Sequence, residues 1–242
     1  MEESENLYDK LQELFGTTPG GFNILEQQID IDLQMQYFDY SRKVKKDLIP
    51  EEVMEASDKL FFEKTDTDQK RELLVKLASV DEVKAYRIIE KFCDIAPDEL
   101  KEWAALAFKE SKMMLESKLL DENQVLISTG LGGIGLKLRY FVVLLGRDEN
   151  EFSEMQKRII KSEFPYILKQ CGSEVEKIVF SEFIATIMAV VPIKIPIKAL
   201  FEEAIFECNT YGNFLEENFI ITNVKELSFK EIKEFLRNKQ DI

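Results

Sequence analysis

The chain changes character along its length, and this change is what most constrains its fold. Glycine and proline are absent from residues 51–96, where apolar residues recur at the three- and four-residue intervals of an amphipathic helix. After the glycine-rich stretch Asp121–Gly135, the apolar runs become short, β-branched and aromatic, which is typical of strands. The sequence therefore predicts an α+β protein, with an all-helical domain at residues 1–122 and an α+β domain at residues 123–242.

Capping residues indicate where the helices of the first half begin. Asn23 with Glu26, and Ser79 with Glu82, match the pattern in which a capping side chain is followed by an acidic third helical residue. Proline is favoured at the first position of a helix. Helices are accordingly expected over residues 4–15, from Asn23 to about Tyr40, from Pro50, over residues 68–78, from Ser79, and from Pro97 to about Leu120.

Two consecutive segments of this half, Leu73–Phe92 and Pro97–Phe108, resemble a HEAT-type helical repeat. The matching features are an apolar helix end, a turn with Asp before a valine, and a second amphipathic helix. Lys84 stands where the repeat usually has an arginine, and no second clear copy follows. The resemblance implies a short helical stack of the kind that offers surface to partner proteins.

The second half has the element order βαββαβ followed by a helix, which is the ferredoxin-like pattern. The extra C-terminal helix begins at a Ser228–Glu231 capping box. Pro165 is expected to kink or split the first helix. The expected strands are Leu138–Leu145, Glu174–Phe180, Phe183–Val191 and Phe219–Val224, and the expected helices before the last are 151–171 and Ile197–Cys208.

Charge within the strands predicts their order in the sheet. Leu138–Leu145 and Phe183–Val191 are the apolar strands, as central strands should be, whereas the second and fourth strands carry or adjoin charges. The predicted order is fourth–first–third–second. Only Ser181 and Glu182 separate the second and third strands, and neither residue favours a tight turn. One long bent strand and a βαβαβ order are therefore the alternative.

Composition excludes several kinds of chemistry. The chain has no histidine, so imidazole catalysis and histidine-ligated metal are absent. Cys93, Cys171 and Cys208 are far apart and form no CxxC pair, which favours reduced thiols over a disulfide or a metal site. We expect neither a cofactor nor a metal.

Charge and hydropathy predict where the protein lies and what it avoids. Met1–Leu7 is acidic, unlike a signal peptide, and no apolar run is long enough to cross a bilayer. We therefore expect a cytoplasmic protein without membrane contact. The net charge is −14, and residues 1–124 hold 17 Lys and Arg against 29 Asp and Glu, which disfavours nucleic acid. The same acidity either attracts a basic partner or only keeps the protein soluble.

The glycines between residues 130 and 135 match the spacing GxGxxG. A dinucleotide fold needs a strand before such glycines and a helix after them, but a strand follows here. A flexible loop between the domains or at the entry to a strand is the favoured interpretation, with an anion- or ligand-binding loop built from backbone N–H groups as an alternative. The residues proposed to bind a ligand are Gly130, Gly132, Gly133, Gly135, Arg139 and Arg147.

The function is predicted by elimination of the chemistries and binding modes that the sequence disfavours. The central strands have Tyr140 and Phe141 but lack the aromatic and basic signature of RNA-binding modules. We expect a non-enzymatic interaction or adaptor module that binds another protein or a second copy of itself. The alternative is a small-molecule sensor, or an enzyme based on carboxylates and lysine, with its site between the two domains.

Overall fold

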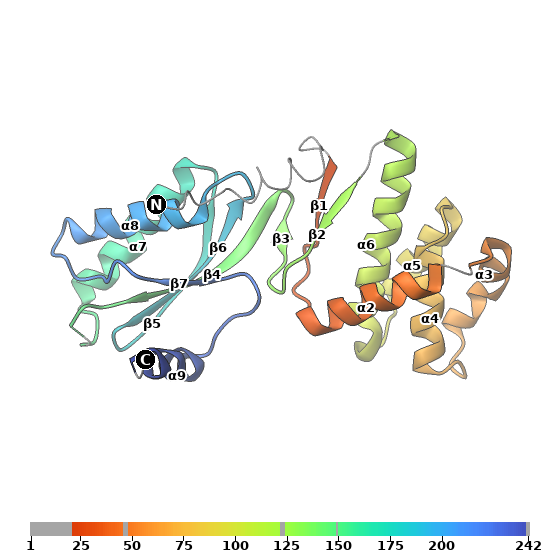
Figure 1. The fold of residues 1–242 in the computed structure, drawn as a ribbon, viewed down its shortest axis with the longest axis horizontal. Helices are drawn as coiled ribbons and strands as arrows, with labels where there is room; N and C mark the ends of the chain where they lie inside the picture. Colours follow the sequence, from red (N-terminus) through yellow and green to blue (C-terminus); the bar gives the residue numbers. More distant parts are fainter. Residues whose placement is uncertain (1–20, 46–47, 122–123, 149, 241–242) are drawn as a thin grey trace. The chain divides into compact units, whose positions relative to one another are not determined.

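The computed structural model describes residues 21–45, 48–121, 124–148 and 150–240, so the helix expected over residues 4–15 lies outside it. The described residues form two compact units, 21–127 and 128–240. The first is mainly helical, and the second is a sheet with helices, so the protein is of the mixed α+β class (Figure 1). Among the described residues, no helix has the length and apolar composition needed to cross a bilayer.

The helical unit consists of α-helices that pack around one core. Its elements are β1 (Phe22–Ile24), α2 (Ile31–Val44), α3 (Pro50–Ala56), the 3₁₀ helix η3 (Ser57–Phe61), α4 (Thr67–Ala78), α5 (Val83–Cys93), α6 (Asp98–Leu120) and β2 (Val125–Ile127). As predicted, Pro50 is at the start of α3, and α6 begins directly after Pro97. Trp103 is a core residue, and its indole N–H donates to the carbonyl of Arg71 at 3.0 Å.

The prediction of a helix from Asn23 was wrong. Phe22–Ile24 is extended and pairs in parallel with Val125–Ile127, so the two ends of the unit lie side by side. The helix begins only after Asp30, whose carboxylate accepts from the backbone N–H groups of Asp32 and Leu33. Leu25 and Ile29 are buried in the core without being helical. Their four-residue spacing is typical of a helix face, and this is why the sequence wrongly predicted a helix here.

The Ser79–Glu82 capping box is absent as well. Ser79 ends α4 instead of starting α5, and its hydroxyl donates back to the carbonyl of Val75 at 3.0 Å. This back-bonding is a common alternative for serine near a helix. Helix α5 starts at Val83 after Glu82, which makes no side-chain capping bond.

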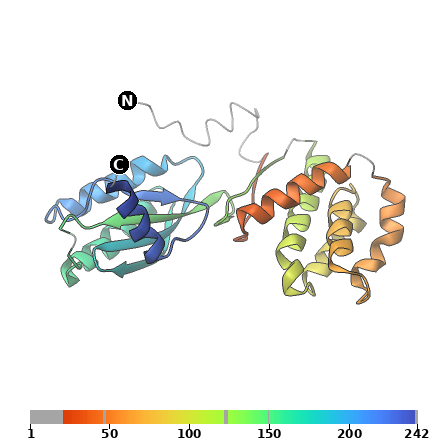
Figure 2. The ribbon, with the colours of Figure 1, turned by 60° about the horizontal axis from the view of Figure 1, so that its bottom comes forward.

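The α+β unit is a sheet with helices on both of its faces. Its elements are β3 (Gly133–Ile134), β4 (Lys137–Leu145), α7 (Glu154–Gln170), β5 (Glu174–Ser181), β6 (Ile184–Pro192), α8 (Ile197–Asn209), β7 (Ile220–Thr222) and α9 (Phe229–Gln240). Helices α7 and α8 cover one face, and α9 lies across the other (Figures 1 and 2).

The strand order is β7–β4–β6–β5, with β3 also beside β4, and every pairing in this sheet is antiparallel. It is the order that the charge pattern predicts. Strands β4 and β6 pair along their full length, from Lys137 opposite Pro192 to Leu145 opposite Ile184. Alternate residues of β4 face opposite layers, so Val142 packs under α7 and α8 whereas Val143 packs under α9.

Two local expectations have different outcomes. Strands β5 and β6 form a hairpin in which Ser181 pairs with Ile184, so the alternative of one bent strand was wrong. Glu182 allows this tight turn by adopting a left-handed φ of 53°.

Pro165 does not split α7, which continues from Glu154 to Gln170. Buried residues on both sides of the proline, among them Ile160 and Leu168, hold the helix against the sheet.

Candidate functional site

The glycines that the sequence singles out lie in a turn and a short strand on the α9 side of the sheet. Leu131, between two of them, is buried in the core under α9. The carbonyl of Gly132 accepts from the backbone N–H of Arg139 at 3.0 Å and from the hydroxyl of Thr129 at 3.3 Å. The backbone N–H of Leu131 donates to the carbonyl of Asn223. Gly130 and Gly133 are buried and Gly135 is exposed, so the loop presents few backbone groups to a ligand.

Arg139 of β4 pairs with Glu176 of β5, the strand that lies beyond β6 in the sheet. Its guanidinium makes two hydrogen bonds to Glu176, at 2.6 and 2.8 Å, and a third to the carbonyl of Leu131. The side chain is only 11% exposed. Hydrogen bonding to Glu176 raises the pKa of Arg139 above its usual value. This bidentate pair ties the glycine turn to β5 across β6.

Arg147 lies at the other end of β4. Strand β4 is nine residues long, so its two ends lie about 25–30 Å apart at roughly 3.3 Å per residue. The structure therefore does not bring Arg139 and Arg147 together. The six residues proposed from the sequence divide into a glycine–Arg139 group and Arg147 alone.

Arg147 belongs to a pocket that the sequence does not reveal. The pocket, called here the α9 pocket, has a volume of about 600 Å³ and lies where β4, the β5–β6 hairpin and α9 meet. Its lining consists of Leu145, Gly146, Arg147, Glu182, Phe183, Glu216, Asn218, Lys233, Leu236 and Arg237. All of these residues belong to the α+β unit.

The framework of the pocket is fixed by backbone bonds. Gly146 donates to the carbonyl of Phe183 at 2.7 Å, and Glu216 donates to the carbonyl of Leu145 at 2.8 Å. A β-carbon on Gly146 would lie 3.3 Å from the ring of Phe152, so the close approach of this ring favours glycine. These bonds hold the pocket floor, which Leu145 and Phe183 share with Leu236 of α9.

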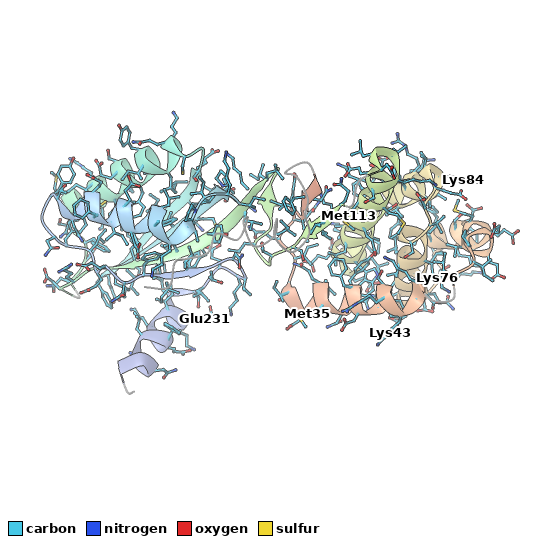
Figure 3. All side chains as sticks on the ribbon, turned by 45° about the horizontal axis from the view of Figure 1, so that its top comes forward. Met35, Lys43, Lys76, Lys84, Met113 and Glu231 are labelled. Carbon is cyan, nitrogen blue, oxygen red and sulfur yellow. The ribbon has the colours of Figure 1, made fainter. Side chains whose placement is uncertain are left out.

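Helix α9 forms one wall and is anchored at three places. Ile232 is fully buried against the sheet. The predicted capping box is present: Ser228 N–H donates to Glu231 at 2.8 Å, and Glu231 N–H donates to the hydroxyl of Ser228 at 3.3 Å. Lys233 forms an ion pair of 2.8 Å with Glu182 on the hairpin. Figure 3 shows Glu231 on the first turn of the helix.

The carboxylate of this cap is strongly acidic. The pKa of Glu231 is lowered from 4.5 to about 2, first by the hydrogen bond from Lys225 and then by those from Ser228. Above that pH the charged carboxylate therefore keeps the start of α9, the helix that carries Lys233 and Arg237, capped.

Three cations surround the apolar floor. Arg147 donates through Nε to the carbonyl of Leu215 at 2.9 Å and through Nη2 to Glu217 at 3.1 Å. Lys233 pairs with Glu182, whereas Arg237 is exposed and has no ion pair within the described part of the chain. Glu182 and Glu216 also line the pocket, so an anionic group that carries an apolar body would be received by Arg237, beside the apolar floor.

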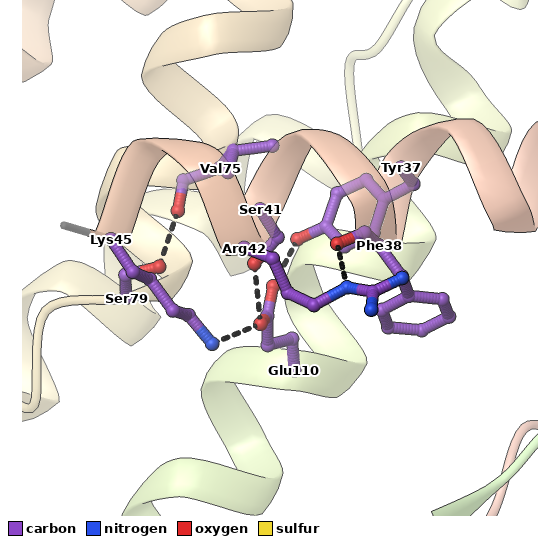
Figure 4. Close-up of polar contacts among 8 residues, drawn as sticks. All are labelled: Tyr37, Phe38, Ser41, Arg42, Lys45, Val75, Ser79 and Glu110. Carbon is purple, nitrogen blue, oxygen red and sulfur yellow. Dashed lines mark hydrogen bonds and ion pairs between the residues drawn. The ribbon is translucent and has the colours of Figure 1, made fainter.

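The helical unit holds a buried carboxylate that serves packing. Glu110 of α6, 4% exposed, accepts hydrogen bonds from the hydroxyls of Tyr37 and Ser41 and from Lys45, all on or next to α2 (Figure 4). The distances are 2.6, 2.8 and 2.6 Å. Burial, followed by the charge and hydrogen bond of Glu110, raises the pKa of Tyr37 well above 10.0. The cluster joins α2 to α6.

Cys93 and Cys208 are poor nucleophiles at neutral pH. Burial, followed by nearby carboxylates, raises the pKa of Cys93 to about 11 and that of Cys208 to about 12. Within the described ranges, no three His, Cys, Asp or Glu side chains gather as metal ligands would.

Sequence reasoning found Arg147 but missed Lys233 and Arg237. The available signal was the apolar spacing of the last helix, in which Ile232 and Leu236 recur four residues apart. That spacing identifies the side of α9 that faces the sheet, and Lys233 flanks it. The hairpin partner of Lys233, Glu182, is distant in sequence and carries no local signal.

Comparisons with known proteins leave the family of this chain open. No family model matches the chain, and no curated protein matches it either. Among solved structures, a "putative transposase" from Deinococcus radiodurans R1 is similar at 17% sequence identity and a TM-score of 0.34. The similarity covers 43% of this chain and 91% of that one, and at this TM-score it carries no argument about function.

Proposed function

We propose that this chain is a non-catalytic protein-interaction module that docks its partner on helix α9 and the α9 pocket. The partner is a protein segment that carries an acidic residue next to an apolar one. The observation that carries the proposal is the α9 pocket itself, in which an apolar floor lies beside an arginine that has no counter-ion within the described residues.

The fold within this proposal is a short HEAT-like helical stack joined to a ferredoxin-like domain. Supporting the second part, the sheet has the order β7–β4–β6–β5 and two helices on one face. Supporting the first, α4, α5 and α6 are consecutive helices that contribute to one core. Lys84 is exposed on α5, the second of these helices (Figure 3). The two units are proposed to be separate domains.

Charge complementarity points to an acidic partner. The chain has a net charge of −14, and α9 carries Glu231 and Glu234 as well as Lys230, Lys233 and Arg237. Lys230 pairs with Glu234 and Lys233 with Glu182, which leaves Arg237 as the cation of these three without an ion pair to the described residues. The carboxylates that pair with the pocket cations are themselves exposed, 85% in the case of Glu217. Exposed ion pairs contribute only about 0–1 kcal/mol, so an incoming carboxylate can replace them at small cost.

Apolar side chains on α9 and at the floor of the α9 pocket would contact the apolar residue of the partner. Phe235 of α9 is 51% exposed. Phe183 and Leu236 are half-buried at the floor of the pocket. Aromatic side chains and arginine are the residues most enriched at the energetic centres of protein interfaces. An apolar side chain of the partner would bury this surface.

A second candidate function, the binding of a small organic molecule, is favoured by the volume of the pocket. A cavity of about 600 Å³ lies in the range of roughly 300–1,000 Å³ that is usual for ligand sites. The site lies inside the α+β unit, so this candidate needs no pocket between domains.

The proposal is tested by selecting peptides from a random display library on the full chain. We expect the selected peptides to carry Asp or Glu next to Leu, Ile, Phe or Tyr. Their affinity should fall about tenfold or more in Arg237→Gln, as for loss of a charge-assisted contact. Phe235→Ser should weaken the same peptides.

The matched control is Lys198→Gln, which removes one positive charge from an exposed residue of α8, outside the pocket. It should leave the affinity unchanged. Selection of basic peptides, or equal affinity for the wild-type chain and Arg237→Gln, would contradict the proposal.

A further inference from the structure

A second pocket adjoins the α9 pocket in the α+β unit. This second pocket, called here the α8 pocket, has a volume of about 700 Å³ and is lined by Phe206 of α8 and by Asn213, Glu217 and Asn218 of the following segment, among others. Asn218 lines both pockets. Arg147 of the α9 pocket and Glu217 of the α8 pocket are 3.1 Å apart between Nη2 and Oε1. The two pockets are therefore neighbours.

The chain between the pockets is held in place by backbone and side-chain bonds. Leu215 forms a β-bridge with Gly146, and the N–H of Glu216 donates to the carbonyl of Leu145 at 2.8 Å. Asn209 of α8 holds the same segment, because its side-chain amide donates to the carbonyl of Leu215 at 2.9 Å and accepts from the N–H of Leu215 at 2.8 Å. One asparagine side chain thus binds both backbone groups of one residue.

Asn218 carries the same amide with its hydrogen-bonding capacity unused. Its side chain is exposed and makes no hydrogen bond to the described residues. A primary amide is both a donor and an acceptor, so it can pair with the N–H and C=O of an incoming backbone as Asn209 pairs with Leu215. Asn218 lies between the bridge at Leu215 and the start of β7 at Ile220, so its own backbone loses little freedom on binding.

The α8 pocket has no unpaired charge that would select a charged ligand. Glu217 pairs with Arg147, and Glu202 pairs with Lys198 at 3.7 Å. The pocket instead offers the ring of Phe206, which is 68% exposed. An exposed aromatic ring beside an unpaired amide is suited to an apolar side chain and the main chain that carries it.

We infer that the partner segment binds in an extended conformation across both pockets, with Asn218 hydrogen-bonded to its main chain and a second apolar side chain against Phe206. The inference rests on the proposed function, in which the acidic residue and the first apolar residue of the same segment occupy the α9 pocket. An extended segment keeps its backbone N–H and C=O groups available to the protein, whereas a helix bonds them internally.

A backbone ester scan of one selected acidic peptide tests the main-chain contact. Each N–H of the peptide is replaced in turn by an ester oxygen, and its affinity for the full chain is measured by isothermal titration calorimetry. We expect one position at which the ester weakens binding about fivefold to the wild-type chain, as for one lost hydrogen bond, and about twofold at most to Asn218→Ala. Equal losses in both chains at every position would overturn the inference.

An alanine scan of the same peptide tests the contact with the α8 pocket. We expect an apolar residue beyond the acidic–apolar pair whose replacement weakens binding about tenfold to the wild-type chain and about twofold to Phe206→Ser. Met155→Ser is the matched control, because it removes a side chain of similar exposure, 64%, from α7, outside both pockets. It should give the same scan as the wild-type chain.

The inference and the proposed function fail separately. If the peptide loses affinity in Arg237→Gln but its scans show no dependence on Asn218 or on Phe206, the inference is wrong and the proposed function stands. Dependence on only one of these two residues also overturns the inference, which requires both. If no peptide is selected, or if its affinity does not depend on Arg237, both fail.

Discussion

The phenolic hydroxyl of Tyr37 donates a hydrogen bond of 2.6 Å to the carboxylate of Glu110 inside the helical unit. Both side chains are buried, and the ring of Tyr37 also meets Trp103 edge to face at 5.1 Å between centroids. Ser41 and Lys45 donate to the other carboxylate oxygen. The contact therefore links α2 to α6 through polar atoms and aromatic packing together (Figure 4).

Removal of this carboxylate should destabilise the helical unit. Glu110→Gln replaces an acceptor of three hydrogen bonds with a group that also donates, so we expect a loss of about 2–4 kcal/mol. Tyr37→Phe should cost about 1.5–3 kcal/mol. Urea unfolding followed by the fluorescence of Trp103, the single tryptophan, measures both.

The double variant shows whether the two residues act on each other. We expect its loss to be smaller than the sum of the single losses by about 1 kcal/mol, because both variants remove the same bond. Additive losses would show that the bond contributes nothing measurable.

Cys208 should resist alkylation while the α+β unit is folded. Its side chain is fully buried and its pKa is raised to about 12, so only about one molecule in 10⁴ carries the thiolate at pH 8. Iodoacetamide labelling followed by peptide mass mapping should show Cys208 unmodified in buffer and modified in urea. Equal labelling in both conditions would contradict its position in the core.

The helix cap at Glu231 should lose its stabilising effect in acid. A carboxylate with a depressed pKa stabilises the folded state above its unfolded pKa, near 4.5, and this stabilisation is lost as the pH falls towards 2. Amide hydrogen exchange of α9 should therefore accelerate over this interval beyond the intrinsic pH effect. Glu231→Gln should lack that pH-dependent change. An identical pH profile in the variant would exclude a role for the carboxylate.

Ile232→Ala should loosen α9 while leaving the sheet intact. Ile232 is fully buried, and large-to-small changes at such positions cost about 2–5 kcal/mol. Hydrogen exchange should rise in α9 and remain slow in β4 and β6, which pair along their full length. Peptide affinity for the α9 pocket should fall with it. Uniform acceleration across the sheet would show that α9 is part of the folding core.

Sequence patterns predicted the elements whose signals are local. The apolar runs Leu138–Leu145 and Phe183–Val191 predicted the central pair, because a strand buried on both faces must be apolar throughout. The Ser228–Glu231 cap was found because its two partners lie three residues apart. These predictions needed no knowledge of distant contacts.

Non-local contacts account for most of the errors. Phe22–Ile24 is a strand only because Val125–Ile127, about a hundred residues away, pairs with it. The α9 pocket joins Arg147 after β4, Glu182 in the β5–β6 turn and Lys233 of α9, which are far apart in the sequence. No local spacing reports such pairings. The Ser79–Glu82 error has a local cause instead: the serine hydroxyl donates to the carbonyl of Val75 and does not cap Glu82, whose N–H donates to the carbonyl of Val80.

A charge-reversal experiment determines whether an acidic partner docks on the α9 pocket through Arg237. Fluorescence anisotropy measures the binding of two labelled peptides, one selected acidic peptide and the same peptide with its acidic residue replaced by lysine. We expect the wild-type chain to prefer the acidic peptide, and Arg237→Glu to lose affinity for it and gain affinity for the lysine version. Unchanged preference in Arg237→Glu would contradict the assignment of the α9 pocket as the docking site.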